Sequence, residues 1–179
     1  SNLLGKQPGW KIGGIGRDYH SGDCRFILDL GGDDVYDLSY DPSKPHGVII
    51  IDLSGNDVYR SPTDFALGSG CLSVGLLLDY SGDDTYQARS FALGSGYFGF
   101  GLLHDASGND RYDGDTHVQG AGSFGIGLLI DESGRDMYNA ALNAQGFGCV
   151  QGVGALYDLE GSDSYHAGGK YKYVLRYED

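Results

Sequence analysis

The sequence predicts an all-β protein folded as a parallel β-helix (solenoid) of about six coils, and three observations lead to this prediction. A nine-residue pattern, apolar-Asp-x-Ser/Gly-Gly-x-Asp-x-Tyr, returns six times with small departures. Glycine supplies 32 of 179 residues, about 18% against a usual ~7%. An apolar period of 3.6 residues, which amphipathic helices need, persists nowhere for a dozen residues.

The nine-residue pattern defines columns of identical residues. The repeats occupy residues 28–36, 51–59, 78–86, 104–112, 130–138 and 157–165, and their first aspartates are 23, 27, 26, 26 and 27 residues apart. The first aspartate column consists of Asp29, Asp52, Asp79, Asp105, Asp131 and Asp158. The second aspartate column consists of Asp34, Asp57, Asp84, Asp110, Asp136 and Asp163. The glycine column is Gly32, Gly55, Gly82, Gly108, Gly134 and Gly161, and the tyrosine column is Tyr36, Tyr59, Tyr86, Tyr112, Tyr138 and Tyr165.

A second motif with alternating glycines lies between the repeats, as in residues 66–70, 92–96, 118–122 and 144–148. Alternation with period 2 indicates strands, and short strands between glycine turns in a unit of roughly 26 residues are typical of one solenoid coil. Stacked glycines are expected where a corner requires positive φ. A propeller or a sandwich is the alternative, but a propeller blade needs about 40 residues and a sandwich would not repeat residue by residue.

We expect one domain over residues 1–179. Residues 1–27 are predicted to be an irregular N-terminal coil or cap, residues 28–165 to hold the six repeats, and residues 166–179 to form a C-terminal cap or edge strand. The opening Ser1-Asn2 looks like a cleavage remnant, so we expect a fragment of a larger protein.

The charge and the apolar runs exclude two classes of partner. The net charge is −13, from 12 basic and 25 acidic residues, which argues against nucleic acid and anionic membranes. The longest apolar runs, such as residues 48–51, are far shorter than the ~18 residues of a membrane span.

Cys71 and Cys149 share a repeat position three coils apart, roughly 14 Å, which is too far for a disulfide.

The two aspartate columns require a neutralising partner. Carboxylates stacked about 4.8 Å apart repel by ~1 kcal/mol in water and ~3.5 kcal/mol at an effective dielectric near 20. Backbone N–H groups of a tight turn are one possible partner, as in Asx turns. Divalent cations, most readily Ca²⁺, are the other, since Asp-x-x-Gly-x-Asp places two carboxylates at one turn. Both readings stay open, and all twelve column aspartates are candidate metal ligands.

A further candidate cluster lies in the two least regular coils. Asp18, His20, Asp41 and His46 either form a small acid–base or metal site or belong to a solvated cap.

The Gly-x-Asp-x-apolar segments, such as Gly55-Asn56-Asp57-Val58-Tyr59 and residues 108–112, resemble the second half of the RTX (hemolysin-type) calcium repeat. That resemblance implies Ca²⁺ held between successive coils, with metal contact assigned to the second aspartate column. The overall shape also resembles the parallel β-helices of secreted polysaccharide-active enzymes and adhesins. It implies an extracellular, periplasmic or cell-surface location.

We therefore expect a calcium-stabilised structural or adhesion module of a larger exported protein. Its expected partners are a polysaccharide or a cell-surface component, with end-to-end contacts through the solenoid ends. The alternative is a carbohydrate-active β-helix enzyme. We favour a role without catalysis, because the few cations of the stack, Arg89, Arg111 and Arg135, occupy unrelated repeat positions and form no cluster.

Overall fold

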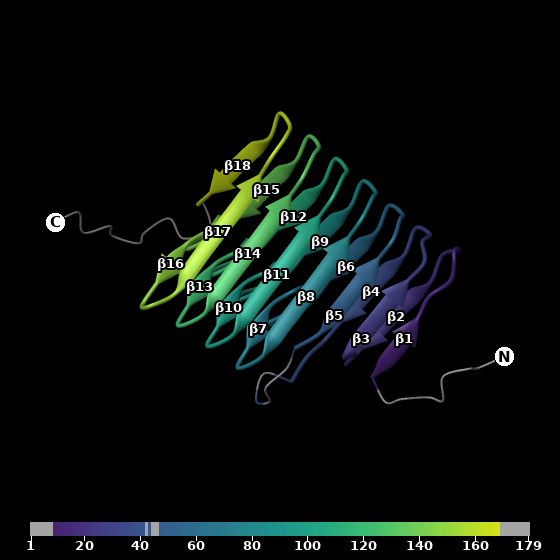
Figure 1. Ribbon diagram of the computed structural model, residues 1–179, viewed down its shortest axis with the longest axis horizontal. Coiled ribbons are helices and arrows are strands. Elements are labelled where there is room, and N and C mark those ends of the chain that lie inside the picture. Colours follow the sequence, from purple (N-terminus) through teal and green to yellow (C-terminus); the bar gives the residue numbers. More distant parts are fainter. Residues whose placement is uncertain (1–8, 42, 44–46, 169–179) are drawn as a thin grey trace.

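A computed structural model describes residues 9–41, 43 and 47–168. These residues form β-strands and no helix, and the strands build three parallel sheets in a stack of coils, two of which run its whole length (Figure 1). The predicted parallel β-solenoid is therefore confirmed. Within the described ranges, no helix has the length and apolar character needed to cross a bilayer.

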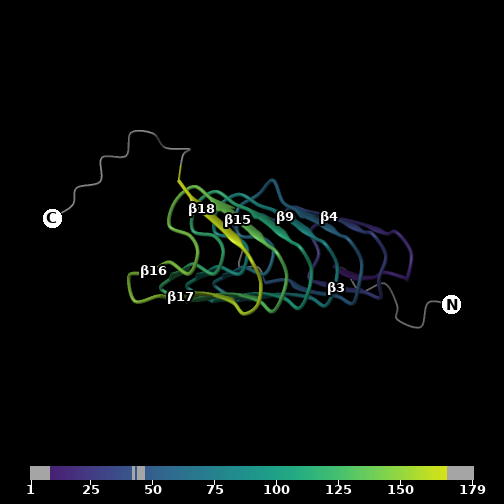
Figure 2. The same ribbon diagram turned by 90° about the horizontal axis from the view of Figure 1, so that it is seen from above.

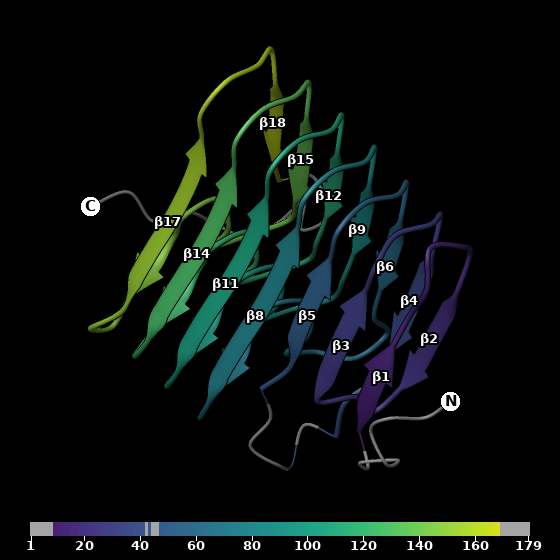
Figure 3. The ribbon, with the colours of Figure 1, turned by 45° about the vertical axis from the view of Figure 1, so that its right-hand side comes forward.

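Sheets A and B each contain one strand per coil. Sheet A contains β1 (Trp10–Ile12), β3 (Phe26–Asp29), β5 (Ile49–Asp52), β8 (Val74–Asp79), β11 (Phe100–Asp105), β14 (Ile126–Asp131) and β17 (Val153–Asp158). Sheet B contains β2 (Tyr19–Gly22), β4 (Val35–Leu38), β6 (Val58–Arg60), β9 (Thr85–Gln87), β12 (Arg111–Asp113), β15 (Met137–Ala140) and β18 (Ser164–Ala167). From sheet A the chain turns a sharp corner into sheet B, as Figure 3 shows.

Sheet C closes the coils that carry the Gly-x-Gly motif. It contains the two-residue strands β7 (Gly70–Cys71), β10 (Gly96–Tyr97), β13 (Gly122–Ser123) and β16 (Gly148–Cys149). The coils before residue 66 lack this motif and contribute no strand to sheet C.

The N-terminal segment is more regular than its sequence indicates. Residues 1–27 are predicted as an irregular coil or cap, yet β1 and β2 pair in register with β3 and β4 and add a further coil to the six repeats. The C-terminal prediction falls mostly on residues 169–179, which lie outside the described residues; β18 ends at Ala167.

The residue columns stack in register. Sheet A pairs the first aspartate column member to member from Asp29 to Asp158, and sheet B does the same for the tyrosine column. Successive tyrosine rings stack with centroids 4.4–4.9 Å apart. The first and second aspartate columns therefore form two adjacent ladders at one corner.

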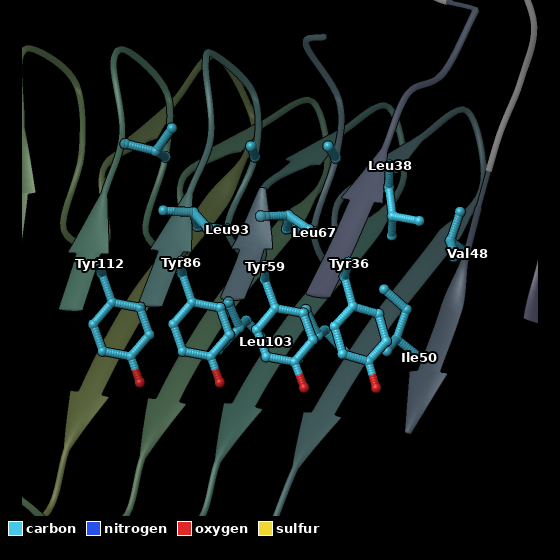
Figure 4. Packing of buried hydrophobic residues seen from close by; sticks show 14 of the residues in the cluster. Tyr36, Leu38, Val48, Ile50, Tyr59, Leu67, Tyr86, Leu93, Leu103 and Tyr112 are labelled. Carbon is cyan, nitrogen blue, oxygen red and sulfur yellow. The ribbon is translucent and has the colours of Figure 1, made fainter. Parts of the chain in front are cut away.

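The tyrosine rings also form much of the core. Tyr36 to Tyr138 of this column are fully buried, together with aliphatic residues that face them from sheet A, such as Leu77 and Leu103. In Figure 4 the labelled rings lie parallel and their hydroxyl oxygens point the same way. His20 takes the tyrosine position in the N-terminal coil and stacks on Tyr36 at 4.8 Å.

The turn into sheet C combines an expected feature with an unexpected one. Gly68, Gly94, Gly120 and Gly146 have φ between 75° and 79°, as predicted for corner glycines. The residue before each of them, Leu or Gln, also has positive φ, between 52° and 55°. The cysteines follow the prediction: all three are free, and Cys71 and Cys149 occupy the same register position of sheet C.

Candidate metal centre at the aspartate corner

The corner between sheets A and B brings the twelve column aspartates together. Each first-column aspartate is the last residue of a sheet A strand, and each second-column aspartate directly precedes a sheet B strand. From Asp29 to Asp136 these side chains are at most 2% exposed, while Asp158 and Asp163 in the last coil are half-buried. The corner is thus a row of carboxyl groups inside the protein, not on its surface.

Four members of the first column form Asx turns, one of the two possibilities that the sequence left open. One carboxylate oxygen accepts the N–H of the residue two positions later, at 2.9 Å from Ser54 to Asp52 and 3.1 Å from Ser81 to Asp79. Asp29 and Asp105 make the same bond. Charge-assisted bonds of this kind stabilise a carboxylate and fix the turn.

The tyrosine column supplies a second donor to the first column. Tyr59 donates its hydroxyl to Asp79 of the next coil at 2.5 Å, and Tyr86 donates to Asp105 at 2.6 Å. Tyr112 bridges two coils, with bonds of 2.8 Å to Asp131 and 3.2 Å to Asp105. Burial and the nearby carboxylates raise the pKa of Tyr112, so the hydroxyl stays protonated.

Sequence reasoning identified these tyrosines only as a repeat column and missed their role as donors. The available signal was that a buried column contains tyrosine six times, although phenylalanine would fill the same space without a hydroxyl to satisfy. His20 continues the role in the N-terminal coil, where its Nε2 lies 2.6 Å from Asp29 Oδ2.

The second column connects neighbouring coils. Oδ1 of each member accepts the backbone N–H of the equivalent residue in the preceding coil, at 2.6 Å from Asp57 to Asp84 and 2.7 Å from Asp84 to Asp110. Asp18 occupies the first position of this ladder and donates its N–H to Asp34. These bonds run between coils, whereas the prediction placed them within one turn.

The other carboxylate oxygens of the second column have no hydrogen-bond partner. The buried Oδ2 atoms without a donor belong to Asp34, Asp57, Asp84, Asp110 and Asp136. A buried acceptor left unpaired costs about 1–3 kcal/mol. Five consecutive coils repeat this arrangement, so it is a property of the corner.

Carboxylate oxygens of the two columns converge in five groups of three. In each group the oxygens all lie within 4.8 Å of one another. The groups are Asp29–Asp34–Asp52, Asp57–Asp79–Asp84, Asp84–Asp105–Asp110, Asp110–Asp131–Asp136 and Asp136–Asp158–Asp163. All twelve aspartates predicted as metal ligands lie at this corner, and these groups include every one of them.

Burial shapes the electrostatics of the corner. Desolvation, assisted by the charge of the neighbouring column, raises the pKa of Asp57 to about 8, of Asp84 to about 10 and of Asp110 to about 9. The pKa of Asp79 in the first column rises less, to about 6, because Tyr59 donates a hydrogen bond to it. With no cation bound, Asp57, Asp84 and Asp110 therefore hold protons at neutral pH.

The corner fits a hard divalent cation in donor type and spacing. Two oxygens bound to one Ca²⁺ at about 2.4 Å can be at most about 4.8 Å apart, and the oxygens of each group meet this limit. All donors are carboxylate oxygens, which Ca²⁺ prefers and Zn²⁺ does not. Each group contributes three of the six to eight oxygens that Ca²⁺ takes, and the unpartnered Oδ2 atoms supply acceptors that a cation would satisfy.

The described members of the second candidate cluster bind other partners. His20 points into the corner toward Asp29, Asp18 accepts the N–H of Gly14, and Asp41 accepts from Ser43. His46 lies outside the described residues.

A shallow groove follows the end of sheet B. One part of about 550 Å³ is lined by Gln87, Ala88, Arg89, Asp113, Gly114 and Asp115, and a neighbouring part of about 320 Å³ adds Asp37 and Arg60. Neither lining contains an aromatic ring. The groove therefore lacks the stacking surface expected for a polysaccharide.

Fold and corner together define a parallel β-solenoid with an internal carboxylate ladder. Among known proteins, no family model, no curated protein and no solved structure matches this chain.

Replacing Tyr112 by phenylalanine tests the tyrosine donors. We expect Tyr112→Phe to lower the free energy of unfolding by about 2 kcal/mol, because two buried carboxylates lose the hydroxyl proton that they share. Urea denaturation followed by circular dichroism measures the loss. Tyr80→Phe, at an exposed position, serves as the control and should change stability by less than about 0.5 kcal/mol. Equal losses in both variants would contradict the role of the hydroxyl.

Proposed function

We propose that this chain is a rigid structural or adhesion module of a larger exported protein, and that divalent cations, above all Ca²⁺, stabilise its aspartate corner. The observation that carries the proposal is the row of unpartnered, buried Oδ2 atoms in five consecutive coils. Each of these five aspartates belongs to at least one group of three carboxylates that have oxygens close enough to share one cation.

The charge of the ladder supports a cation. The twelve column aspartates account for nearly all of the net charge of −13. The only basic side chain bonded to them within the described residues is His20, at the N-terminal end. Stacked carboxylates repel one another more strongly when buried than in water. A cation between coils would offset this repulsion and connect neighbouring coils.

A structural role suits the position of these carboxylates. From Asp29 to Asp136 they are buried, so a polymeric substrate cannot reach them, and they cannot serve as the paired acid and base of a glycosidase. The stack instead offers a stiff body in which parallel strands connect every coil to the next. The proposed partners of its surface are a polysaccharide or a cell-surface component.

An exported location agrees with the availability of calcium outside cells. Extracellular calcium modules work with dissociation constants of about 10⁻⁴ to 10⁻³ M, which suits a site that fills outside the cell.

Thermal melting tests the proposal. We expect Ca²⁺ at about 100 times its dissociation constant to raise Tm by roughly 5–10 °C over the protein in EGTA, since one such site adds about 2.7 kcal/mol. Circular dichroism at neutral pH measures the shift, and Na⁺ at matched ionic strength is the control. An equal Tm in EGTA and in saturating Ca²⁺ would overturn the proposal and leave protons as the neutralising partner.

A further inference from the structure

The outer face of sheet A is almost entirely apolar. Strand register aligns its outward side chains in three rows. The rows are Trp10, Phe26, Ile49, Leu76, Leu102, Leu128 and Ala155; then Ile12, Leu28, Ile51, Leu78, His104, Ile130 and Tyr157; then Val74, Phe100, Ile126 and Val153. His104 is the one polar member apart from the tyrosine hydroxyl. All of these side chains are half-buried or exposed, with Tyr157 at 55%.

The outer face of sheet B is more polar than that of sheet A, so the solenoid does not require a wholly apolar exterior. One outward row mixes Thr85 with apolar residues such as Val58 and Met137. The other outward row is polar: Arg60 pairs with Asp37 at 2.8 Å, and Asp113 pairs with Arg111 at 2.6 Å. The same coils thus present charged and polar residues on sheet B and an almost entirely apolar surface on sheet A.

An uncovered apolar face of this kind is unusual. Parallel sheets occur almost always with both faces covered, and contiguous apolar patches beyond a few hundred Å² usually mark interaction sites. The core already covers the inner face of sheet A, where Leu77, Leu103 and Leu129 are fully buried. A partner is therefore needed only for the outer face.

We propose that a second copy of this chain covers the outer face of sheet A, as a two-fold face-to-face dimer. Sheet A forms the flat lower layer of the stack in Figure 2. Seven strands about 4.8 Å apart, with central strands of six residues rising about 3.3 Å each, give a face of roughly 500 Å². Two copies bury about 1,000 Å², the area that a specific interface needs.

The residues of the face fit a copy of themselves. A two-fold interface places the same surface on both partners, and flat apolar sheets pack about 10 Å apart with their strands aligned within about 30°. The three rows contain no carboxylate, so two acidic chains can meet there with few like charges facing each other, although Glu132 lies beside the face. His104 bonds to Glu132 at 2.8 Å, so its imidazole already has a partner.

Analytical ultracentrifugation tests the dimer with the full chain. We expect a reversible dimer between about 1 and 100 µM, a range usual for interfaces of this size. Leu102→Lys should raise the dissociation constant by about 100-fold or more, because the symmetry places two unpaired ammonium groups in the buried face. Thr85→Lys, at an equally half-buried position on sheet B, is the matched control and should leave the dimer intact.

Three outcomes would overturn the dimer. They are a wild-type chain that stays monomeric throughout this range, a folded Leu102→Lys variant that still dimerises, and equal weakening by Thr85→Lys. Binding of the monomer to phosphatidylcholine vesicles, without self-association, would assign the face to a lipid surface and also overturn the proposal. If circular dichroism shows that Leu102→Lys does not fold, the Leu76→Thr/Leu102→Thr double variant replaces it, since threonine already stands at outward position 85 of sheet B. This dimer does not depend on the aspartate corner, so EGTA should not dissociate it.

Discussion

Gly108→Ala should prevent this chain from reaching a stable fold. A Cβ atom at residue 108 would lie 1.8 Å from the carbonyl oxygen of Gly82 and 2.5 Å from a carboxylate oxygen of Asp110. Neither group can move easily, because Gly82 and Gly108 donate their N–H groups to the next coil, at 3.0 and 3.1 Å. We expect the free energy of unfolding to fall by about 4 kcal/mol or more, a loss typical of severe steric conflicts.

Chemical denaturation of Gly108→Ala against Gly16→Ala measures this loss. A Cβ atom at Gly16 would meet no atom within 4 Å, so this control should stay within about 0.5 kcal/mol of the wild type. A Gly108→Ala protein as stable as the control would mean that the coils are not packed as closely at this corner as the structure has them.

The repeat allowed the stack to be predicted because it fixes which residues become neighbours. Six copies of one pattern place Asp79 beside Asp105 whatever the details of the coil. Glycine at every repeat of a corner indicates a close backbone approach, and Gly82 lies against Gly55 as expected. The Asx turns followed from the same reasoning, since aspartate accepts N–H bonds from residues two positions later.

The donors of the corner did not follow from the pattern, because they depend on which coil each side chain reaches. Tyr86 donates to Asp105 of the next coil, while Tyr138 donates to Asp131 of its own coil. The repeat period alone does not predict whether a tyrosine bonds to an aspartate of its own coil or of the next one. It also gives no hint that the second column would leave one oxygen unpartnered at Asp84 or Asp110.

The sequence also does not predict the positive φ angles of the residues before the corner glycines. Leucine at φ 54°, as at residue 93, is locally unfavourable. Hydrogen bonds to neighbouring coils hold it there: Leu93 donates to Ala66 at 3.3 Å, and its carbonyl accepts from Gly120 at 2.9 Å. Stacking between coils therefore overrides the local preference, which single-residue propensities cannot anticipate.

The second large effect concerns the partner of the aspartate ladder, and Asp84→Asn separates a cation from a proton. Asp84 belongs to two of the five carboxylate groups. Asparagine keeps an oxygen for the N–H of Asp57, which Asp84 accepts at 2.6 Å. Its amide can also donate to a neighbouring carboxylate, as a protonated aspartate would. The substitution therefore preserves the protonated corner and removes a cation ligand.

Without calcium, we expect pH to distinguish the two proteins. Burial raises the pKa of Asp84 to about 10, against about 4 in the unfolded chain. A raised carboxyl pKa gives stability that is complete below about pH 4 and is lost as pH rises through about 10. In EGTA the wild type should therefore lose Tm between pH 7 and pH 10, and Asp84→Asn should lose less, because its amide does not ionise.

With calcium, the order of the two proteins should reverse, so that the wild type gains more in Tm than Asp84→Asn. Ca²⁺ must displace the protons of the second column, so the gain in Tm of the wild type should be larger at pH 9 than at pH 6. Asp84→Asn should lose about two fifths of that gain, since two of the five groups lose a charged ligand. Asp83→Asn changes the exposed neighbour of the same turn and should keep the full gain. A complete calcium response in Asp84→Asn would exclude the two carboxylate groups that share Asp84 as cation sites, because the substitution removes a charged ligand from both while leaving the hydrogen bond from Asp57 in place.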